Sequence, residues 1–143
     1  MNRGKKFESI IGEALNNIKD SYCIDLYDQM GYTNYPSDYI FYKDGMFYCI
    51  ECKSHQRASI PFNCISDNQW KYMEDAIAVS GVNAYVIVWF VDKDVTKLYN
   101  FEDLLALKNQ GVKSIRFDSD KGIIVPAVKK RTYFDYDLGE LLC

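Results

Sequence analysis

The sequence predicts an α/β fold in which helices flank a mixed central β-sheet. Three observations support this class: an amphipathic helical pattern near the N-terminus, a tight hairpin in the first half of the chain, and a continuous apolar run over residues 83–91. Helical and strand-like segments alternate, as expected for a sheet covered by helices. With 143 residues, of which 48% are hydrophobic, the chain can bury one sizeable core, so we expect a single domain over residues 1–143.

The first helix is expected over residues 5–19, where apolar side chains recur at helical spacing. On a helical wheel Glu8 falls at the rim of the apolar face, and Glu13 faces solvent. Gly12 follows Glu8 by one turn and leaves space on the same flank. A substrate could use that space to reach the site, or the glycine could have no specific role there.

Strand-like segments follow at residues 22–27, 38–43 and 46–54. Asp44-Gly45 joins the last two, and this dipeptide is a strong signal for a two-residue type I′ turn. The turn fixes the register of the hairpin. Lys43 then faces Met46, and the same count makes Asp38 face Glu51. Lys53 leaves the strand on the same face as Glu51, because it follows two residues later.

The second helix has a well-defined start. Ser66 and Gln69 form an S-x-x-Q capping box, and Ile65 and Trp70 are placed as a hydrophobic staple. Gly81 is the expected end of this helical region.

A central strand covered on both faces is expected at residues 83–91. A short strand follows at 98–101, and Asn100 is placed to cap a helix over 102–109 that Gly111 ends. The remaining segments read as short strands and loops whose order the sequence does not give: "SIRF", "GIIVPAV" and "RTYFDY".

Composition argues against several functional classes. The most apolar stretch, 84–91, is too short to cross a bilayer, so we expect a cytoplasmic protein without a membrane partner. Five cysteines do not form a disulfide framework. Cys49 and Cys52 match C-x-x-C, but three residues apart in a strand they point to opposite faces, which disfavours a redox or metal role. Net charge −3 and a pI of about 5.1 argue against a general nucleic-acid coat but allow local basic patches.

Two directly opposed carboxylates repel each other unless something compensates. In one interpretation Glu51 and Lys53 form an ordinary surface ion pair, and Asp38 lies at a fraying strand end. In the other, a divalent cation lies between Asp38 and Glu51, because ions such as Mg²⁺ prefer carboxylate oxygens. The apolar residues that flank both acids favour the cation, and the ion pair stays open as the alternative.

An acidic residue that opens a hairpin, followed by E-x-K in the second strand, resembles the PD-(D/E)XK nuclease superfamily. Further segments occur in the same order as in the RecU-type Holliday junction resolvases, especially compact relatives of the kind phages encode. These segments, within residues 2–115, are "NRGKKFE", "SDYIFY", "IECKSH", "SIPF", "SDNQW" and "VNAYVIVWF". The resemblance implies a restriction endonuclease-like fold, a homodimer and Mg²⁺-dependent cleavage of branched DNA in recombination, repair or phage DNA processing, with Mn²⁺ able to substitute.

The resemblance also implies roles for individual residues. Asp38 and Glu51 would bind the metal, with Gln69 beside it as a further ligand. Lys53 would orient or activate the attacking water and offset negative charge in the transition state. Glu8 would be the helix-borne acid of the first motif. Gln69 is equally explained as the third residue of the capping box.

Several residues are candidates for DNA contacts. A basic rim that grips the backbone would consist of Arg3, Lys5, Lys6, His55 and Arg57. A second basic run, which is either a DNA contact or only a solvated surface, is Lys129, Lys130 and Arg131. Unpaired bases could stack on aromatic rings, although core packing is the commoner use of tyrosine; the candidates are Tyr32, Tyr35 and Tyr39.

Two departures from the family pattern matter. Ser37 stands where the motif has a proline before the Asp, and the segment between Glu8 and Asp38 is shorter than in larger RecU proteins, where it forms a stalk over the junction. Cleavage is therefore better supported than a preference for four-way junctions. The alternatives are a general or restriction-type DNA nuclease without junction preference, and a non-catalytic DNA-binding module with a relic site.

Overall fold

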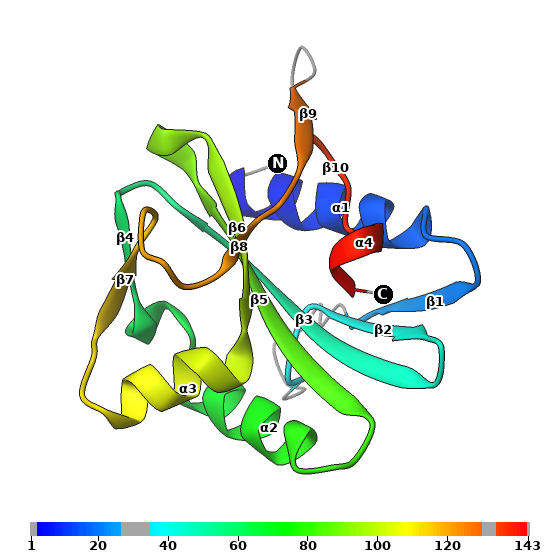
Figure 1. The fold of residues 1–143 in the computed structure, drawn as a ribbon, viewed down its shortest axis with the longest axis horizontal. Helices are drawn as coiled ribbons and strands as arrows, with labels where there is room; N and C mark the ends of the chain where they lie inside the picture. Colours follow the sequence, from blue (N-terminus) through cyan, green and yellow to red (C-terminus); the bar gives the residue numbers. More distant parts are fainter. Residues whose placement is uncertain (1–2, 27–34, 130–133, 143) are drawn as a thin grey trace.

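Helices lie on both faces of a mixed β-sheet in the computed structural model, which describes residues 3–26, 35–129 and 134–142 (Figure 1). Within these residues the main sheet has the strand order β1-β2-β3-β5-β6-β8. β3 and β5 run parallel and the other neighbours run antiparallel. The strands are β1 (Ser21–Asp25), β2 (Tyr39–Lys43), β3 (Met46–His55), β5 (Val82–Phe90), β6 (Val95–Asn100) and β8 (Ile123–Ile124). The α/β class with a mixed central sheet is therefore confirmed.

One face of the sheet is covered by α1 (Arg3–Asn16), and the other by α2 (Asp67–Ile77) and α3 (Phe101–Asn109) (Figure 1). The short α4 (Gly139–Leu142) packs on the α1 side. Two clusters of buried side chains fill the two layers, and β5 contributes to both because its successive side chains alternate between the faces. None of the helices in the described ranges is long and apolar enough to cross a bilayer.

Two small ribbons lie outside the main sheet. They pair β4 (Ser59–Pro61) with β7 (Ser114–Arg116), and β9 (Ala127–Lys129) with β10 (Phe134–Tyr136). The 3-10 turns η1 (Phe62–Cys64) and η2 (Val91–Lys93) connect neighbouring elements. The sequence did not indicate the β4–β7 pair, because its strands are far apart in the chain and only a long-range contact joins them.

The hairpin register predicted from Asp44-Gly45 is confirmed. Both residues have positive φ, 52° and 80°, as a type I′ turn requires. Lys43 pairs with Met46, and the ladder continues to Tyr39 and Ile50. The five pairs of this ladder, from Lys43–Met46 to Tyr39–Ile50, therefore have the facing that the sequence predicted.

Element boundaries differ from the predictions at a few positions. α1 begins at Arg3 and ends at Asn16, three residues before the predicted end. The Asn16 side chain donates to the Gly12 carbonyl oxygen at 2.9 Å, and Asp20 has a φ of 55°, so the chain turns away there. β6 begins at Val95, earlier than the predicted strand, and β1 ends at Asp25. The predicted last residue of β1, Tyr27, lies outside the described residues.

The space beside Gly12 is filled, so its interpretation as an opening for substrate is wrong. The Tyr39 hydroxyl occupies it and donates a hydrogen bond to the Glu8 carbonyl oxygen at 2.9 Å. A Cβ at position 12 would overlap that hydroxyl. Gly12 therefore lets α1 approach β2 closely.

Gly12→Ala is expected to destabilise the protein by about 1–3 kcal/mol, because the added methyl group overpacks a site where Tyr39 is only 5% exposed. Urea unfolding followed by circular dichroism measures this loss. Ser9→Ala, at an exposed position of the same helix, is the matched control and should change the free energy of unfolding by no more than about 0.5 kcal/mol. Equal stabilities of the two variants would contradict the close approach.

Candidate active site

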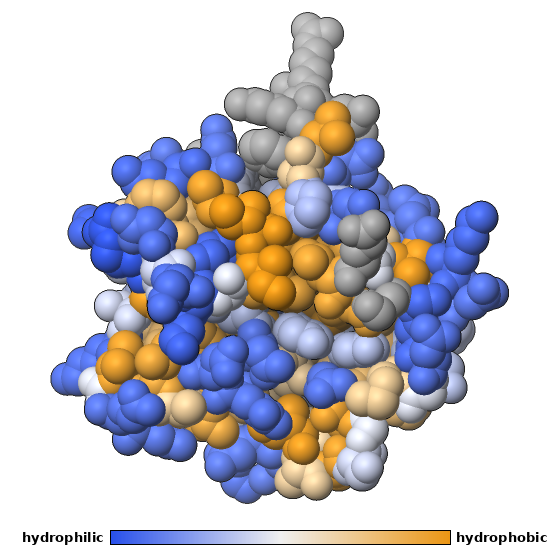
Figure 2. Space-filling model, in the orientation of Figure 1, coloured by the Kyte–Doolittle hydropathy of each residue, from blue (hydrophilic) through white to orange (hydrophobic). Residues whose placement is uncertain are grey.

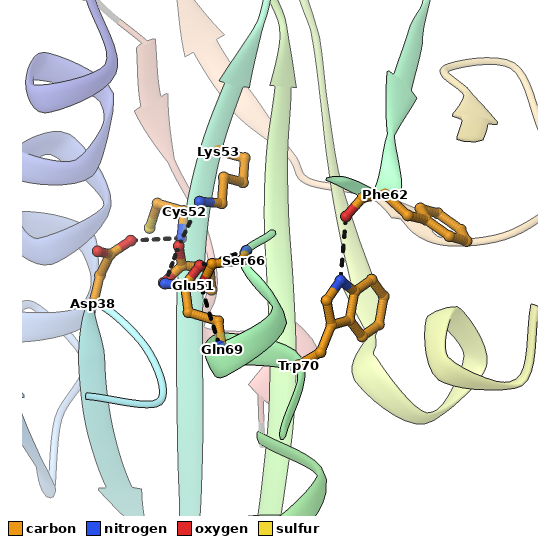
Figure 3. Close-up of polar contacts among 8 residues, drawn as sticks. All are labelled: Asp38, Glu51, Cys52, Lys53, Phe62, Ser66, Gln69 and Trp70. Carbon is orange, nitrogen blue, oxygen red and sulfur yellow. Dashed lines mark hydrogen bonds and ion pairs between the residues drawn. The ribbon is translucent and has the colours of Figure 1, made fainter. Parts of the chain in front are cut away.

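The acidic and basic residues of the predicted site meet where β2 begins, halfway along β3, and at the first turn of α2 (Figure 3). Side chains of β3 alternate: Cys49 packs with the α2 layer, whereas Ile50 and Cys52 pack with the α1 layer. Glu51 and Lys53 share the Cys49 face by the same alternation. Cys49 and Cys52 therefore point to opposite faces, as predicted, and both are free thiols.

Glu51 lies at the centre of the site and is 2% exposed. Its Oε2 accepts hydrogen bonds from Lys53 Nζ at 2.9 Å and from Gln69 Nε2 at 2.9 Å (Figure 3). A buried carboxylate is costly unless charged or hydrogen-bonding partners compensate it. The two donors satisfy one of its oxygens only.

The other carboxylate oxygen, Glu51 Oε1, is buried and has no hydrogen-bond partner in the described part of the chain. Leaving a charged acceptor unpaired costs more than leaving a neutral one. A hard cation would satisfy this oxygen, since carboxylate oxygen is its preferred ligand. No group of three or more His, Cys, Asp or Glu in the described residues could hold a metal ion. The donor set fits an ion that takes few protein ligands and keeps water, as Mg²⁺ does.

Asp38 is close to Glu51, but not as its partner in the ladder, so this detail of the prediction is wrong. The ladder ends at Tyr39 and Ile50, and the Asp38 carbonyl oxygen accepts from the Leu26 N–H at 2.9 Å. The Asp38 Oδ2 accepts from the Cys52 backbone N–H at 2.8 Å (Figure 3). The β2–β3 ladder therefore ends one pair before Asp38, and the Asp38 carboxyl group bonds to the backbone of β3 instead.

The two carboxyl groups nevertheless act on each other. Burial, followed by the charge of Glu51, raises the pKa of Asp38 to about 7, although the Cys52 N–H and the Lys53 charge lower it. A carboxyl group with this pKa exchanges its proton near neutral pH. A cation beside the pair would displace that proton, because it favours the charged form.

Lys53 remains protonated in this site. Burial alone would lower the pKa of Lys53, but the charge and hydrogen bond of Glu51 and the charge of Asp38 outweigh it, so the pKa lies above its ordinary value. The ammonium group is a hydrogen-bond donor and a positive charge at neutral pH. It is not a base that accepts a proton.

The Gln69 side chain makes two sets of hydrogen bonds, one to the helix cap and one to Glu51. The capping box is confirmed: Ser66 Oγ accepts from the Gln69 N–H at 3.1 Å, and Gln69 Oε1 accepts from the Ser66 N–H at 3.4 Å. The amide nitrogen of the same side chain donates to Glu51. Its oxygen faces the helix cap, so the structure assigns Gln69 to orienting Glu51, and its role as a metal ligand stays a prediction.

Glu8 lies half-buried on α1, on the far side of β3 from Lys53. Its charge adds to burial, Asp38 and Glu51 in raising the pKa of the Cys52 thiol. Glu8 and Asp38 thus approach Cys52 from α1 and from β2. The role of Glu8 as an acid of the site stays a prediction.

The predicted DNA-contacting residues occupy two places. Lys6 is exposed near the start of α1, while half-buried His55 ends β3 and exposed Arg57 follows it. Arg3 and Lys5 lie in the first turn of α1. Lys129 is the last residue of β9, and the rest of its basic run, Lys130 and Arg131, lies outside the described residues.

Of the three tyrosines considered for base stacking, Tyr39 is buried, so that role is wrong for it. Its ring packs under α1 and its hydroxyl is bonded to the Glu8 carbonyl oxygen. Tyr35 is 36% exposed, and Tyr32 lies outside the described residues. Sequence reasoning missed the Cys52 N–H that holds Asp38, and no side-chain pattern could have shown a backbone donor.

Comparison with known proteins gives the family. The chain matches the family model described as "RecU: Recombination protein U" over residues 28–136. No curated protein sequence matches it. Among solved structures it is similar to Hjc, a Holliday junction resolvase from the archaeal hyperthermophile Archaeoglobus fulgidus, with 15% sequence identity and a TM-score of 0.53 over 71% of this chain and 75% of that chain. That likeness shows a restriction endonuclease-like fold, and the family match shows that the chain belongs to the RecU family of Holliday junction resolvases.

Proposed function

We propose that this protein is a Mg²⁺-dependent endonuclease that hydrolyses phosphodiester bonds in branched DNA, as a resolvase of four-way junctions. The observation that supports metal dependence is the buried Glu51 Oε1, which has no partner among the described residues and adjoins a second carboxyl group. Asp38 and Glu51 would hold the ion, and Mn²⁺, which accepts the same oxygen ligands, would substitute.

When bound, the ion would supply Lewis-acid stabilisation of the charge on the phosphoryl oxygens. The chain's own residues carry the remaining steps. Gln69 holds Glu51 in place through its amide N–H, and the capping box holds Gln69. The Lys53 ammonium donates to the attacking water or to a phosphate oxygen and offsets the added negative charge as the water oxygen attacks phosphorus and the bridging P–O bond breaks.

DNA would be held by the basic residues that border this site. His55 and Arg57 follow Lys53 by two and four residues, so they would contact phosphates next to the one that is cut. On the α1 side the contacts would come from Arg3, Lys5 and Lys6. Because the net charge of the protein is −3, binding depends on these local groups and should weaken steeply with salt.

We further propose that the protein acts as a homodimer in the cytoplasm. A four-way junction has twofold symmetry, and two identical sites related by a twofold axis would cut its two symmetric strands. The alternatives remain a general or restriction-type nuclease without junction preference and a non-catalytic DNA-binding module with a relic site.

Cleavage of labelled four-way junctions, linear duplex and flaps, with and without Mg²⁺, tests the proposal. The expected result is Mg²⁺-dependent cleavage with a clear preference for the four-way junction. Equal cutting of linear duplex would leave a nuclease without junction preference. No cutting of any substrate, together with unchanged DNA binding by Glu51→Gln, would favour the non-catalytic module.

The raised pKa of Asp38 predicts how the metal-free protein responds to pH. The folded-state pKa of about 7 lies above the ordinary value of 3.8, so the folded state binds the proton more tightly. Stability from this group is therefore full below about pH 4 and is lost as pH rises towards 7. Without metal, the melting temperature should fall by several degrees between pH 5 and pH 8.

Asp38→Asn should flatten that pH dependence, and adding Mg²⁺ at pH 8 should raise the melting temperature of the wild type but not of this variant. Thermal denaturation followed by circular dichroism measures both effects. Asp44→Asn, at an exposed position in the hairpin turn, is the matched control and should behave like the wild type. A wild type that shows no shift at millimolar Mg²⁺ would argue against the cation site.

A further inference from the structure

An open pocket of about 290 Å³ lies between the start of α2 and the end of α3. Its apolar wall consists of buried side chains, among them Phe62, Ile65 and Trp70. Two exposed lysines, Lys108 and Lys113, line it as well. We call this hollow the lysine pocket, and none of the functional residues assigned so far belongs to it.

The backbone holds both lysines in place. Gly111 ends α3 with a φ of 89°, the left-handed conformation that glycine favours after a helix, and its N–H donates to the Lys108 carbonyl oxygen at 3.0 Å. The chain then returns to η1, where the Lys113 carbonyl oxygen accepts from the Phe62 N–H at 2.8 Å. The positions of the two lysines are therefore fixed relative to η1 and α2.

The ammonium groups are available to a ligand from outside the chain. Lys108 Nζ lies 5.2 Å from the centroid of the Trp70 ring, a cation–π contact that orients the side chain and leaves its N–H groups free to donate. Trp70 is itself held, since its Nε1 donates to the Phe62 carbonyl oxygen at 3.2 Å (Figure 3). Within the described residues, neither Lys108 nor Lys113 forms an ion pair with an acid.

The turn η1 connects the lysine pocket with the candidate active site. Figure 3 shows Trp70 on the side of Gln69 that lies away from Asp38. Cys64 is exposed at the end of η1 and interacts electrostatically with the Lys53 ammonium group. A DNA strand bound at Lys53 can therefore continue across η1 to the two lysines.

The pocket also lies on the side of the sheet where positive charge is needed. Lys53 faces the α2 layer, whereas the basic residues of α1 lie on the other face. The net charge of −3 means that a polyanion must bind through local basic groups. Asp67 lines the pocket too, but it is the first residue of α2, where the helix dipole compensates its charge, and it faces two lysines.

The surface around the pocket suits DNA better than a protein partner. Hydrophobic surface gathers in a band around β8, and over α2 and α3 it is interrupted by hydrophilic residues (Figure 2). Trp70 and Phe62 are only 4% and 6% exposed, so the pocket offers little apolar area to a protein. Interfaces with DNA are more polar and more positively charged than interfaces between proteins.

We propose that the lysine pocket binds the phosphate backbone of the DNA strand that leaves the active site on the α2–α3 side, with one phosphate contact from each of Lys108 and Lys113. This inference rests on the proposed function, because it extends the DNA path from the phosphate that is cut. The two lysines are positioning residues. They hold the arm of the substrate in register and take no part in breaking the P–O bond.

The test is the salt dependence of DNA binding by the metal-free full chain. Fluorescence anisotropy measures the affinity for a labelled four-way junction and for linear duplex between about 50 and 200 mM NaCl. Each phosphate contact contributes about 0.9 to the slope of log affinity against log salt. Lys108→Gln and Lys113→Gln should each lower that slope by about 0.9, and the double variant should bind roughly 10–100-fold more weakly at about 0.1 M salt.

Two controls separate a contact from a general effect of charge. Lys19→Gln, at an exposed position after the end of α1, changes the net charge equally and should keep the wild-type slope and affinity. The double variant Lys108→Arg/Lys113→Arg retains both charges and should also bind as the wild type does. With Mg²⁺ and saturating protein, the glutamine variants should cut the junction at close to the wild-type rate, because the groups around Glu51 are unchanged.

Four results would overturn the contact: a wild type that binds no DNA, an unchanged slope in the folded double glutamine variant, an equal loss in Lys19→Gln, or slower cleavage at saturating protein with unchanged affinity. Cleavage separates this inference from the proposed function. A wild type that binds with the expected slopes but cuts no DNA would leave the contact without the nuclease. A wild type that cuts junctions, with a double glutamine variant that binds equally well, would leave the nuclease without the contact.

Discussion

Replacing Glu51 with Gln is expected to lower cleavage of a four-way junction by about 10³-fold or more, since the variant removes the central negative charge of the site. The side chain keeps its size, and its amide oxygen can still accept from Lys53 or Gln69, so the fold should persist. Glu51 is 2% exposed with one oxygen unpartnered, and a neutral amide in its place avoids the cost of a buried charge. Against this gain, the largely buried Lys53 ammonium loses its carboxylate partner, so the metal-free melting temperature should fall by several degrees.

Single-turnover cleavage with Mg²⁺ and electrophoretic binding without Mg²⁺ measure the two parts of this prediction. Glu13→Gln, at an exposed position of α1, is the matched control because it changes the net charge equally and lies away from the site. The control should cut and bind as the wild type does. Cleavage by Glu51→Gln within tenfold of the wild-type rate would rule out the assigned role of the carboxylate.

Local sequence signals predicted the parts of the fold that short-range geometry determines. Asp44-Gly45 defined the turn, and the period of two along both strands then gave every pair from Lys43–Met46 to Tyr39–Ile50. Ser66 and Gln69 marked the start of α2 because their capping bonds join residues three apart. In each case the interacting groups are neighbours in the chain, so a pattern in the sequence contains both partners.

Long-range contacts explain what the sequence did not show. Counting pairs from the turn placed Asp38 opposite Glu51, but the ladder ends one pair earlier. The Asp38 carboxylate accepts from the Cys52 N–H, and its carbonyl oxygen accepts from the Leu26 N–H. In the sequence, Gly12 indicates free space beside the helix. In the structure, the packing of α1 on β2 places the Tyr39 hydroxyl in that space. These interactions depend on how separate elements meet, which no local pattern records.

The sequence predicted the chemistry of the site only where the interacting residues are close together in the chain. Same-face spacing placed Lys53 beside Glu51, and the structure has that ion pair at 2.9 Å. The bond from Gln69 to Glu51 joins a helix cap to the middle of a strand, and only the resemblance to a family suggested that they meet. The protonation of Lys53 and the raised pKa of Asp38 follow from burial and mutual charge, which require the folded structure.

Lys53→Met is expected to separate the two roles of this lysine, which stabilises Glu51 in the absence of metal and acts on the substrate in its presence. Removing one partner of a largely buried ion pair leaves the other charge uncompensated, so the metal-free protein should lose about 2–3 kcal/mol of stability. Mg²⁺ should then bind more tightly than in the wild type, because the ammonium no longer competes for Glu51 Oε2. Cleavage should nevertheless fall by about 10²–10³-fold, since the donor to the reacting phosphate is gone.

Metal-dependent melting shifts and single-turnover rates on the same preparations measure this split. Lys71→Met removes a lysine from an exposed ion pair with Asp75 on α2 and is the matched control, for which all three quantities should stay near their wild-type values. A lysine with only a structural role would give a different pattern: saturating Mg²⁺ would restore stability, and cleavage would recover with it. Tighter metal binding combined with lost cleavage is the result that places the Lys53 ammonium on the reacting groups, because in that variant the ion and its carboxylates are present and only the donor is missing.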